Sequence, residues 1–198
     1  MEKMVLVLTL IAAVLVFGFG CAANGNDDRP QPAPAKSENP VVRLTTDFGN
    51  IDIELLADVA PKHAENFVKL AKEGFYDGLT FHRIIPGFMA QGGDPKGDGT
   101  GGPGYTIPAE FSDLKHTAGM VAAARRGDAV NPDKASSGSQ FYIMFKAAPH
   151  LDGQYTIFGK VIAGMDVVYQ LEKVPLAGSK PVEPVYIRKA EVISGDED

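Results

Sequence analysis

The chain has 198 residues, 44% of them apolar, and a formal net charge of −6, which fits one sizeable domain with a real hydrophobic core. The charge argues against a nucleic-acid partner, because phosphate binding requires clustered Lys and Arg, and a pair such as Arg125–Arg126 falls short of a cluster. The single cysteine, Cys21, excludes an intrachain disulfide and any metal site built from paired thiolates.

The N-terminus has the pattern of an export signal. Residues 4–20 are uncharged and mostly Val, Leu, Ile, Ala and Phe, and Lys3 precedes them. A charged start, an apolar run and small residues are typical of a signal peptide, so we assign residues 1–20 to one and leave them out of the fold. The region 21–40 that follows holds four prolines among polar residues, and it predicts a disordered, extended tether.

Cys21 stands where the apolar run ends, directly after Gly20, in a context that resembles a bacterial lipobox. Gly18 and Phe19 depart from the usual lipobox residues. We expect lipidation of Cys21 and an extracytoplasmic lipoprotein anchored to the cell membrane or the outer membrane. Two alternatives stay open: cleavage after Ala23, which would give a soluble secreted or periplasmic protein, and an uncleaved segment that nearly reaches the ~20 residues needed to span a bilayer.

The region 41–194 reads as one domain, followed by an acidic tail at 195–198. Residues 41–46 are rich in β-branched types and predict a strand, residues 47–50 a turn, and the alternating residues 51–55 the return strand of a hairpin. Pro61 then opens a helix that Gly74 ends.

The rest of the domain is dominated by further expected strands. A long Gly-rich stretch at 92–104 predicts a functional loop, and residues 165–174 predict a second helix. Many strands with two separated helices and no repeating β-α-β order indicate a mainly β barrel or sandwich with helical plugs. The additional strands are expected at 79–85, 141–145, 155–162 and 185–193.

Several familiar site patterns fail on their spacing. The segment from Asp94 begins like a calcium loop, but Lys96 occupies a ligand position and Tyr105 stands where the bidentate Glu belongs. The Gly-rich stretch lacks the Lys-Ser/Thr of a phosphate-binding loop, and Ser139 lies outside a G-x-S-x-G elbow. The four histidines show no metal-ligand spacing, so we expect neither a metal site nor a cofactor.

What remains is the segment 81–94, Phe-His-Arg-Ile-Ile-Pro-Gly-Phe-Met-Ala-Gln-Gly-Gly-Asp. It combines apolar and aromatic residues with one cation and one amide. This segment closely resembles the central signature of the cyclophilins. Four further segments resemble other family motifs in family order: 61–67, 99–102, 138–143 and 151–161. The resemblance implies an eight-stranded antiparallel closed β-barrel capped by two α-helices.

The resemblance also implies a peptidyl-prolyl cis/trans isomerase that acts on proline-containing polypeptides without a cofactor. Rotation about the X–Pro bond makes and breaks no bond between heavy atoms, so a site without a nucleophile suits it. The implied catalytic residues are Arg83, Phe88 and Gln91, with Arg83 donating to the proline nitrogen as it becomes pyramidal. The implied substrate-binding residues are His82, Met89, Ala124, Arg125, Phe141, Tyr142, His150, Leu151 and Tyr155. Among them Phe88, Met89, Phe141 and Leu151 form the proline socket.

Three positions depart from the best-known family members: Tyr142 replaces the second residue of a Phe-Phe pair, His150 replaces a Trp, and Tyr155 replaces a His. The first and third changes keep an aromatic ring, so we expect the socket to survive. His150 is expected at the rim, where it should leave only weak binding of cyclosporin.

The leading hypothesis is a folding catalyst for exported proteins. A non-catalytic proline-peptide binding module or chaperone using the same groove is the alternative, and a purely structural protein of the cell envelope is a third. The presence of Arg83 favours the enzyme, because inactive cyclophilin-like domains typically lose that arginine.

Overall fold

The structure is a computed structural model, and it describes residues 39–195. The signal peptide, the lipidation of Cys21 and nearly all of the tether therefore lie outside the described residues, as does the acidic tail beyond Gly195. In the described part, no helix combines the length and the apolar character needed to cross a membrane.

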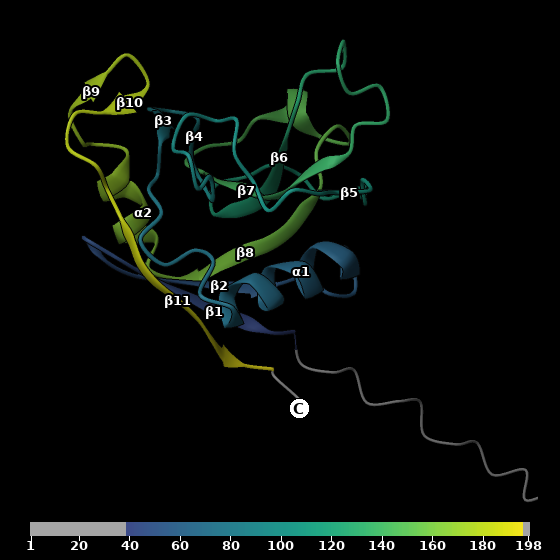
Figure 1. The fold of residues 1–198 in the computed structure, drawn as a ribbon, viewed down its shortest axis with the longest axis horizontal. Coiled ribbons are helices and arrows are strands. Elements are labelled where there is room, and N and C mark those ends of the chain that lie inside the picture. Colours follow the sequence, from purple (N-terminus) through teal and green to yellow (C-terminus); the bar gives the residue numbers. More distant parts are fainter. Residues whose placement is uncertain (1–38, 196–198) are drawn as a thin grey trace, which may run out of the picture. The chain divides into compact units, whose positions relative to one another are not determined.

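The described chain is built around one strongly curled antiparallel sheet (Figure 1). Eight strands follow one another across it in the order β11-β1-β2-β8-β6-β7-β4-β3, and a short strand, β5 (Thr106–Ile107), pairs with β7 outside this path. The mainly β fold with an eight-strand path is thus confirmed. The eight strands are β1 (Val41–Thr46), β2 (Gly49–Leu55), β3 (Arg83–Ile85), β4 (Met89–Gly92), β6 (Met120–Arg125), β7 (Ser136–Met144), β8 (Ile157–Ala163) and β11 (Ile187–Ser194).

The two ends of this sheet, β3 and β11, are not joined by a ladder among the described residues, so the sheet is a strongly curled half-barrel rather than the closed barrel expected. The chain just before β3 makes an isolated bridge from Thr80 to Tyr186, and the Ile187 backbone N–H donates to the Leu79 carbonyl at 2.7 Å. The strand expected over 79–85 is therefore wrong in its first half: only Arg83–Ile85 is regular strand. A separate hairpin of β9 (Leu176–Ala177) and β10 (Lys180–Pro181) stands beside this edge.

Alternating side chains fill the inside of the sheet. In β1, Val42 and Leu44 are fully buried between partly exposed neighbours, and Ile51 and Ile53 of β2 face them. This is the period of two that the sequence shows over 41–55. These residues belong to the main core, whose other large members include Leu55, Phe67, Leu70, Tyr76, Phe81, Phe141, Phe145, Phe158 and Ile187.

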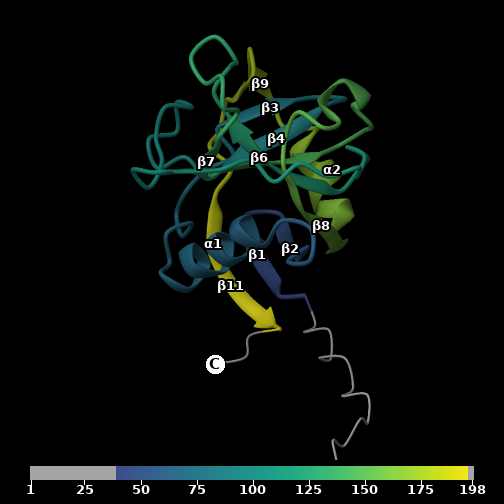
Figure 2. The ribbon, with the colours of Figure 1, turned by 90° about the vertical axis from the view of Figure 1, so that its right-hand side faces the viewer.

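Two helices cover separate parts of the sheet (Figure 2). Helix α1 (Pro61–Lys72) packs against β7, β8 and β11, and α2 (Met165–Leu171) packs against β2. Pro61 is the first residue of α1, as expected. Glu110, from a distant loop, accepts the N–H groups of Lys62 and His63 at 3.2 and 3.1 Å, so a tertiary contact supplies the cap that Ala60 lacks.

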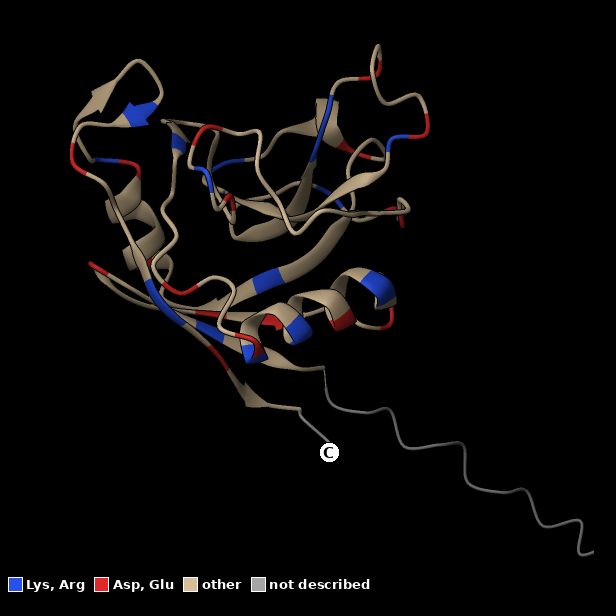
Figure 3. Cartoon of the chain, in the orientation of Figure 1, with Lys and Arg blue, Asp and Glu red and all other residues tan. Residues whose placement is uncertain are grey.

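Most other expected elements are confirmed with shifted ends. The short strands β5, β9 and β10 have no counterpart among the expected elements, and neither has the longer strand Met120–Arg125. Its alanines gave no strand signal, because strand propensity belongs to β-branched and aromatic residues. Its position between β7 and β8 makes it a strand. Lys and Arg are interspersed with Asp and Glu over the described strands, helices and loops (Figure 3).

Candidate active site

A tight turn between β3 and β4 sets the register of the site. Pro86 is second and Gly87 third in the turn, and the Phe88 N–H closes it on the Ile85 carbonyl at 3.0 Å. Gly87 has a φ of +74°, which a type II turn requires and glycine adopts without strain. Glu172, at the end of α2, accepts the Gly87 N–H at 2.6 Å and holds the turn in place.

The turn places Arg83 directly opposite Gln91, and the Arg83 Nη1 donates to Gln91 Oε1 at 3.1 Å. In the ladder between β4 and β7, Gln91 pairs with Tyr142, and in the ladder between β7 and β6, Tyr142 pairs with Ala122. Residues opposite one another in a ladder point to the same side of the sheet. Four strands therefore present one row of side chains, and the exposed guanidinium of Arg83 lies at its end.

Beside this row lies a second apolar cluster, here called the site cluster. Its buried members are Leu56, Met89, Ala122, Ala124, Tyr142, Met144, Ala148, Leu151 and Ile157, and Phe88 and Tyr155 pack against it. The expected socket residues Phe88, Met89 and Leu151 are thus brought together, along with Ala124, Tyr142 and Tyr155. An apolar surface of this kind suits a proline ring, which has no polar group to satisfy.

Phe141 is the exception, and its expected place in the socket is corrected. It is 1% exposed and belongs to the main core, with its ring edge-on to Phe67 and Tyr76 at centroid distances of 5.3 and 5.8 Å. The cause is the strand period: neighbours in β7 point to opposite sides, so the site receives Tyr142 and the core receives Phe141.

Two expected histidines lie in different surroundings. His150 is exposed on the short 3₁₀ turn η1 (Pro149–Leu151). Its ring is tilted relative to the Phe88 ring, with 5.9 Å between the two ring centroids, which fits a position at the rim. His82 is 7% exposed, and neither ring nitrogen of this residue has a hydrogen-bond partner. Burial lowers the pKa of His82. Its side chain therefore offers little surface to a substrate, contrary to the expected substrate-binding role.

The hydroxyl of Tyr142 lies beside a hydrogen-bonded pair formed by the buried His116 and the half-buried Asp152. Tyr142 Oη lies 3.3 Å from His116 Nε2, and His116 Nδ1 lies 3.0 Å from Asp152 Oδ1. A carboxylate only accepts, so Nδ1 carries the proton and Nε2 accepts from the tyrosine. Burial lowers the pKa of His116 against the opposing effect of Asp152, and burial raises the pKa of Tyr142, so both groups are neutral near pH 7.

The side chain of Arg125 has a structural role. The guanidinium is 4% exposed, stacks over the Tyr155 ring at 4.5 Å and donates to the Gln154 carbonyl and to Asp128, at 3.0 and 2.5 Å. These contacts hold Tyr155 beside Tyr142, edge-on at 6.0 Å. The family resemblance implies that Arg125 binds substrate through its main chain, and such a role leaves the side chain free for these contacts.

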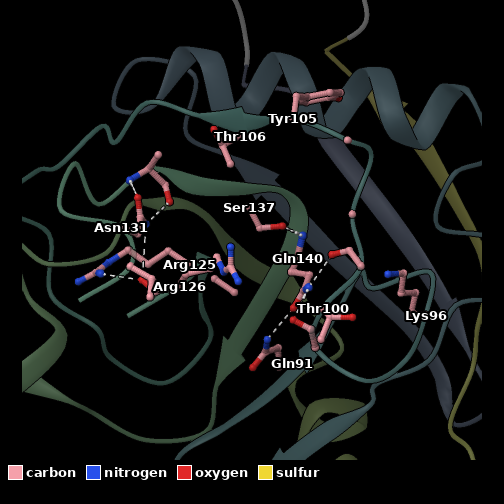
Figure 4. A pocket seen from close by; sticks show the side chains of 17 residues that line it. Gln91, Lys96, Thr100, Tyr105, Thr106, Arg125, Arg126, Asn131, Ser137 and Gln140 are labelled. Carbon is pink, nitrogen blue, oxygen red and sulfur yellow. Dashed lines mark hydrogen bonds between the residues drawn. The ribbon is translucent and has the colours of Figure 1, made fainter. Parts of the chain in front are cut away.

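A pocket of about 770 Å³ with a mixed polar and apolar lining adjoins the row at Gln91 (Figure 4). Lys96 and Arg126 lie on opposite sides of it, and Gln140 lies between them. Sequence reasoning missed its lining residues Lys96, Thr100, Arg126, Asn131, Ser137 and Gln140. Gln140 could have been found, because it lies two residues before Tyr142 on the same strand and so shares its face. In the described residues, no three His, Cys, Asp or Glu side chains are grouped as metal ligands.

Solved structures with this fold define the class of protein. A cyclophilin-type peptidyl-prolyl cis-trans isomerase of Cryptosporidium parvum matches with a TM-score of 0.74 and 35% identity, covering 79% of this chain and 98% of that one. A second structure described under that name, in the presence of the dipeptide Ala-Pro, matches with a TM-score of 0.72 and 35% identity, covering 78% of this chain and 99% of that one.

Sequence comparison then gives the family. The model for cyclophilin type peptidyl-prolyl cis-trans isomerase/CLD matches residues 41–192. Peptidyl-prolyl cis-trans isomerase B of Bacillus subtilis is 51% identical over 125 residues, which are 62% of this chain and 83% of that protein. A match to peptidyl-prolyl cis-trans isomerase-like 2 of Rhizopus delemar is 48% identical over 139 residues, 68% of this chain but only 25% of that longer relative. The chain belongs to the cyclophilin-type peptidyl-prolyl cis-trans isomerase family.

Proposed function

We propose that Arg83 carries the isomerisation by stabilising the twisted state of an X–Pro bond. The planar bond resists rotation with a barrier of ~18–20 kcal/mol, because amide resonance is lost on the way. In the twisted state the proline nitrogen regains a lone pair, which a guanidinium N–H can bind. That interaction is absent in both planar states, so it lowers the barrier rather than only binding substrate.

The observation that carries this proposal is the hydrogen bond from Arg83 Nη1 to Gln91 Oε1. It holds an exposed cation beside an apolar cluster, while the other guanidinium donors of Arg83 have no hydrogen-bond partner among the described residues. Phe88, Met89, Tyr142 and Leu151 would take the proline ring. The Cryptosporidium relative in the presence of Ala-Pro supports proline-containing peptides as the ligand class.

Arg83→Ala tests the assignment. Losing a charge-assisted hydrogen bond of ~1.5–3 kcal/mol predicts a fall in kcat/KM of about 10- to 150-fold in a proline-peptide isomerisation assay. Arg83→Lys should also be impaired, since a point charge cannot reproduce the fork of donors. Arg188→Ala is the matched control and should keep normal turnover. Arg188 is an exposed arginine on β11 that forms an ion pair with Asp47. Normal turnover in folded Arg83→Ala would reject the mechanism. Absent turnover with intact peptide binding in the wild type would instead establish a binding module.

We further propose that the protein is an extracytoplasmic lipoprotein that assists the folding of exported proteins. The support is the apolar run at 4–20, Cys21 at its end and the proline-rich region behind it. Cys21→Ser should shift the full-length protein from the detergent phase to the aqueous phase, or leave an unprocessed precursor. Identical partitioning and processing of the two forms would reject lipidation at Cys21.

A further inference from the structure

Asp94 is a buried carboxylate that organises the Gly-rich loop beside the active site. It is 1% exposed, and its two oxygens accept backbone N–H groups from Lys96, Asp98 and Gly99 at 2.8, 3.1 and 2.5 Å. Burial alone would raise the pKa of Asp94, but the backbone donors outweigh it and the pKa is lowered. The loop is fitted closely around this group: a Cβ on Gly101 would lie 2.0 Å from Asp94 Oδ1.

The same loop presents two carbonyls to Gln140. Gln140 Nε2 donates to the carbonyls of Gly99 and Gly101, at 3.1 and 2.7 Å. Carbonyls only accept, so the amide of Gln140 has a single satisfactory orientation, with its NH₂ toward the loop. Its oxygen is thereby turned toward Gln91.

The orientation of the Gln140 amide determines that of Gln91, which in turn binds the catalytic arginine. Gln91 Nε2 donates to Gln140 Oε1 at 2.9 Å, which leaves Gln91 Oε1 facing Arg83 Nη1 at 3.1 Å. A reversed Gln140 would place two NH₂ groups together, and a reversed Gln91 would oppose its own NH₂ to the guanidinium. The hydrogen bonds are thus directional along the whole path from loop to arginine.

We propose that Asp94 is a positioning residue for catalysis, which aims the Arg83 guanidinium through the Gly99 and Gly101 carbonyls, Gln140 and Gln91. Asp94 itself does not touch the substrate. This inference deepens the proposed function, since it depends on Arg83 being the catalytic group. Asp98 is the other acid of the loop. Within residues 39–195 its carboxylate accepts hydrogen bonds from Thr100 alone, at the exposed tip, so it has no such path to Arg83.

The first test compares two amide substitutions in the full-length protein. Asp94→Asn replaces an accepting oxygen with a donor that opposes the loop N–H groups. We expect kcat/KM to fall about 5- to 30-fold, because a misplaced catalytic group loses much of its rate. Asp98→Asn makes the same change of charge in the same loop, and it should stay within about twofold of wild type.

The decisive test is a double-mutant cycle with Arg83→Ala. If Asp94 acts only by aiming Arg83, then Asp94→Asn should cost no more than about twofold when Arg83 is already absent. An equal loss in both backgrounds would show a general effect on the fold and would overturn the proposal. If Arg83→Ala itself retained full turnover, the proposed function would fail first, so the two failures are distinguishable.

A second variant keeps the test valid should Asp94→Asn not fold. Gln140→Leu removes the middle of the path without placing a charge in the site. It should lower kcat/KM to a similar extent in the wild type and have no further effect beyond about twofold on Arg83→Ala. Wild-type turnover in a folded Gln140→Leu protein would reject the path, since no link would then join the loop to Gln91.

Discussion

The two sides of β7 have opposite tasks. On one side Phe141 packs among Phe67, Tyr76 and Phe81 in the main core, where nearly every large side chain is shielded from solvent. On the other side Tyr142 belongs to the site cluster, several members of which keep between 5% and 9% of their surface exposed. The main core is closed, whereas part of the site cluster reaches the molecular surface. Adjacent residues of similar chemistry thus differ in what they support, stability or binding.

The largest expected effect is on the closed side. Phe141→Ala should lower the free energy of unfolding by about 3–5 kcal/mol, because the cavity it leaves is surrounded by aromatic rings that cannot collapse into it. Urea denaturation measures the change. Phe48→Ala, at an exposed phenylalanine in the turn between β1 and β2, should change stability by less than about 0.5 kcal/mol. A similarly small loss for Phe141→Ala would mean that the two sides of β7 do not differ in this way.

The rim of the open side should control drug binding more than turnover. His150→Trp adds an indole N–H and a broader apolar face beside Phe88, together worth roughly 1–3 kcal/mol. Cyclosporin should therefore bind about 5- to 150-fold more tightly, while kcat/KM for short peptides changes only a few-fold. Drug titration and peptide turnover on the same preparations measure both. Unchanged drug affinity would indicate that His150 does not face the bound drug, or that Tyr155 limits binding.

Each side of β7 also has its own buried histidine: His63 stacks on Phe158, and His116 stacks on Tyr142. A third buried histidine, His82, lies near Asp94. Burial lowers the pKa of all three, although carboxylates oppose it. Unfolded histidine has a pKa of about 6.5, so the unfolded state binds more protons as the pH falls below that value.

Stability should therefore be complete above about pH 6.5 and decline as the pH falls toward the lower pKa values of the folded state. Denaturation midpoints at pH 7.5 and 5.5 check the direction. His82→Leu should flatten the decline, since in the described structure no carboxylate hydrogen bond stabilises the protonated form of this histidine and offsets the effect of burial. A midpoint at pH 5.5 equal to or above that at pH 7.5 would contradict the sign.

The smallest effect is expected from one oxygen atom on the open side. Tyr142→Phe removes the hydroxyl that lies 3.3 Å from His116 Nε2 and should cost about 0.5–1.5 kcal/mol in the free energy of unfolding. Turnover should remain within about twofold, because the ring stays in the socket. Tyr169→Phe, at an exposed position on α2, is the control and should be neutral. A large loss of activity in Tyr142→Phe would place the hydroxyl in contact with substrate.

The sequence alone determined the family, the mainly β fold, the first hairpin, the start of α1 and the presence of Arg83, Phe88, Met89 and Gln91 in one site. These features are local: alternation within a strand, a proline at a helix start, and a contiguous signature at 81–94. Local patterns depend on residues that are close together in the chain, so they can be recognised in the amino-acid sequence.

Only the tertiary structure decided which side of β7 belongs to the candidate site, that an alanine-rich segment is the central strand β6, and that hydrogen bonds link the loop of Asp94 through Gln140 to Gln91. Each of these depends on the register between strands or on hydrogen bonds between residues far apart in the chain. A shift of one residue would exchange Phe141 and Tyr142 between core and site, and nothing in either side chain prevents it. The packing of the neighbouring strands sets that register, and the function of the site follows from it.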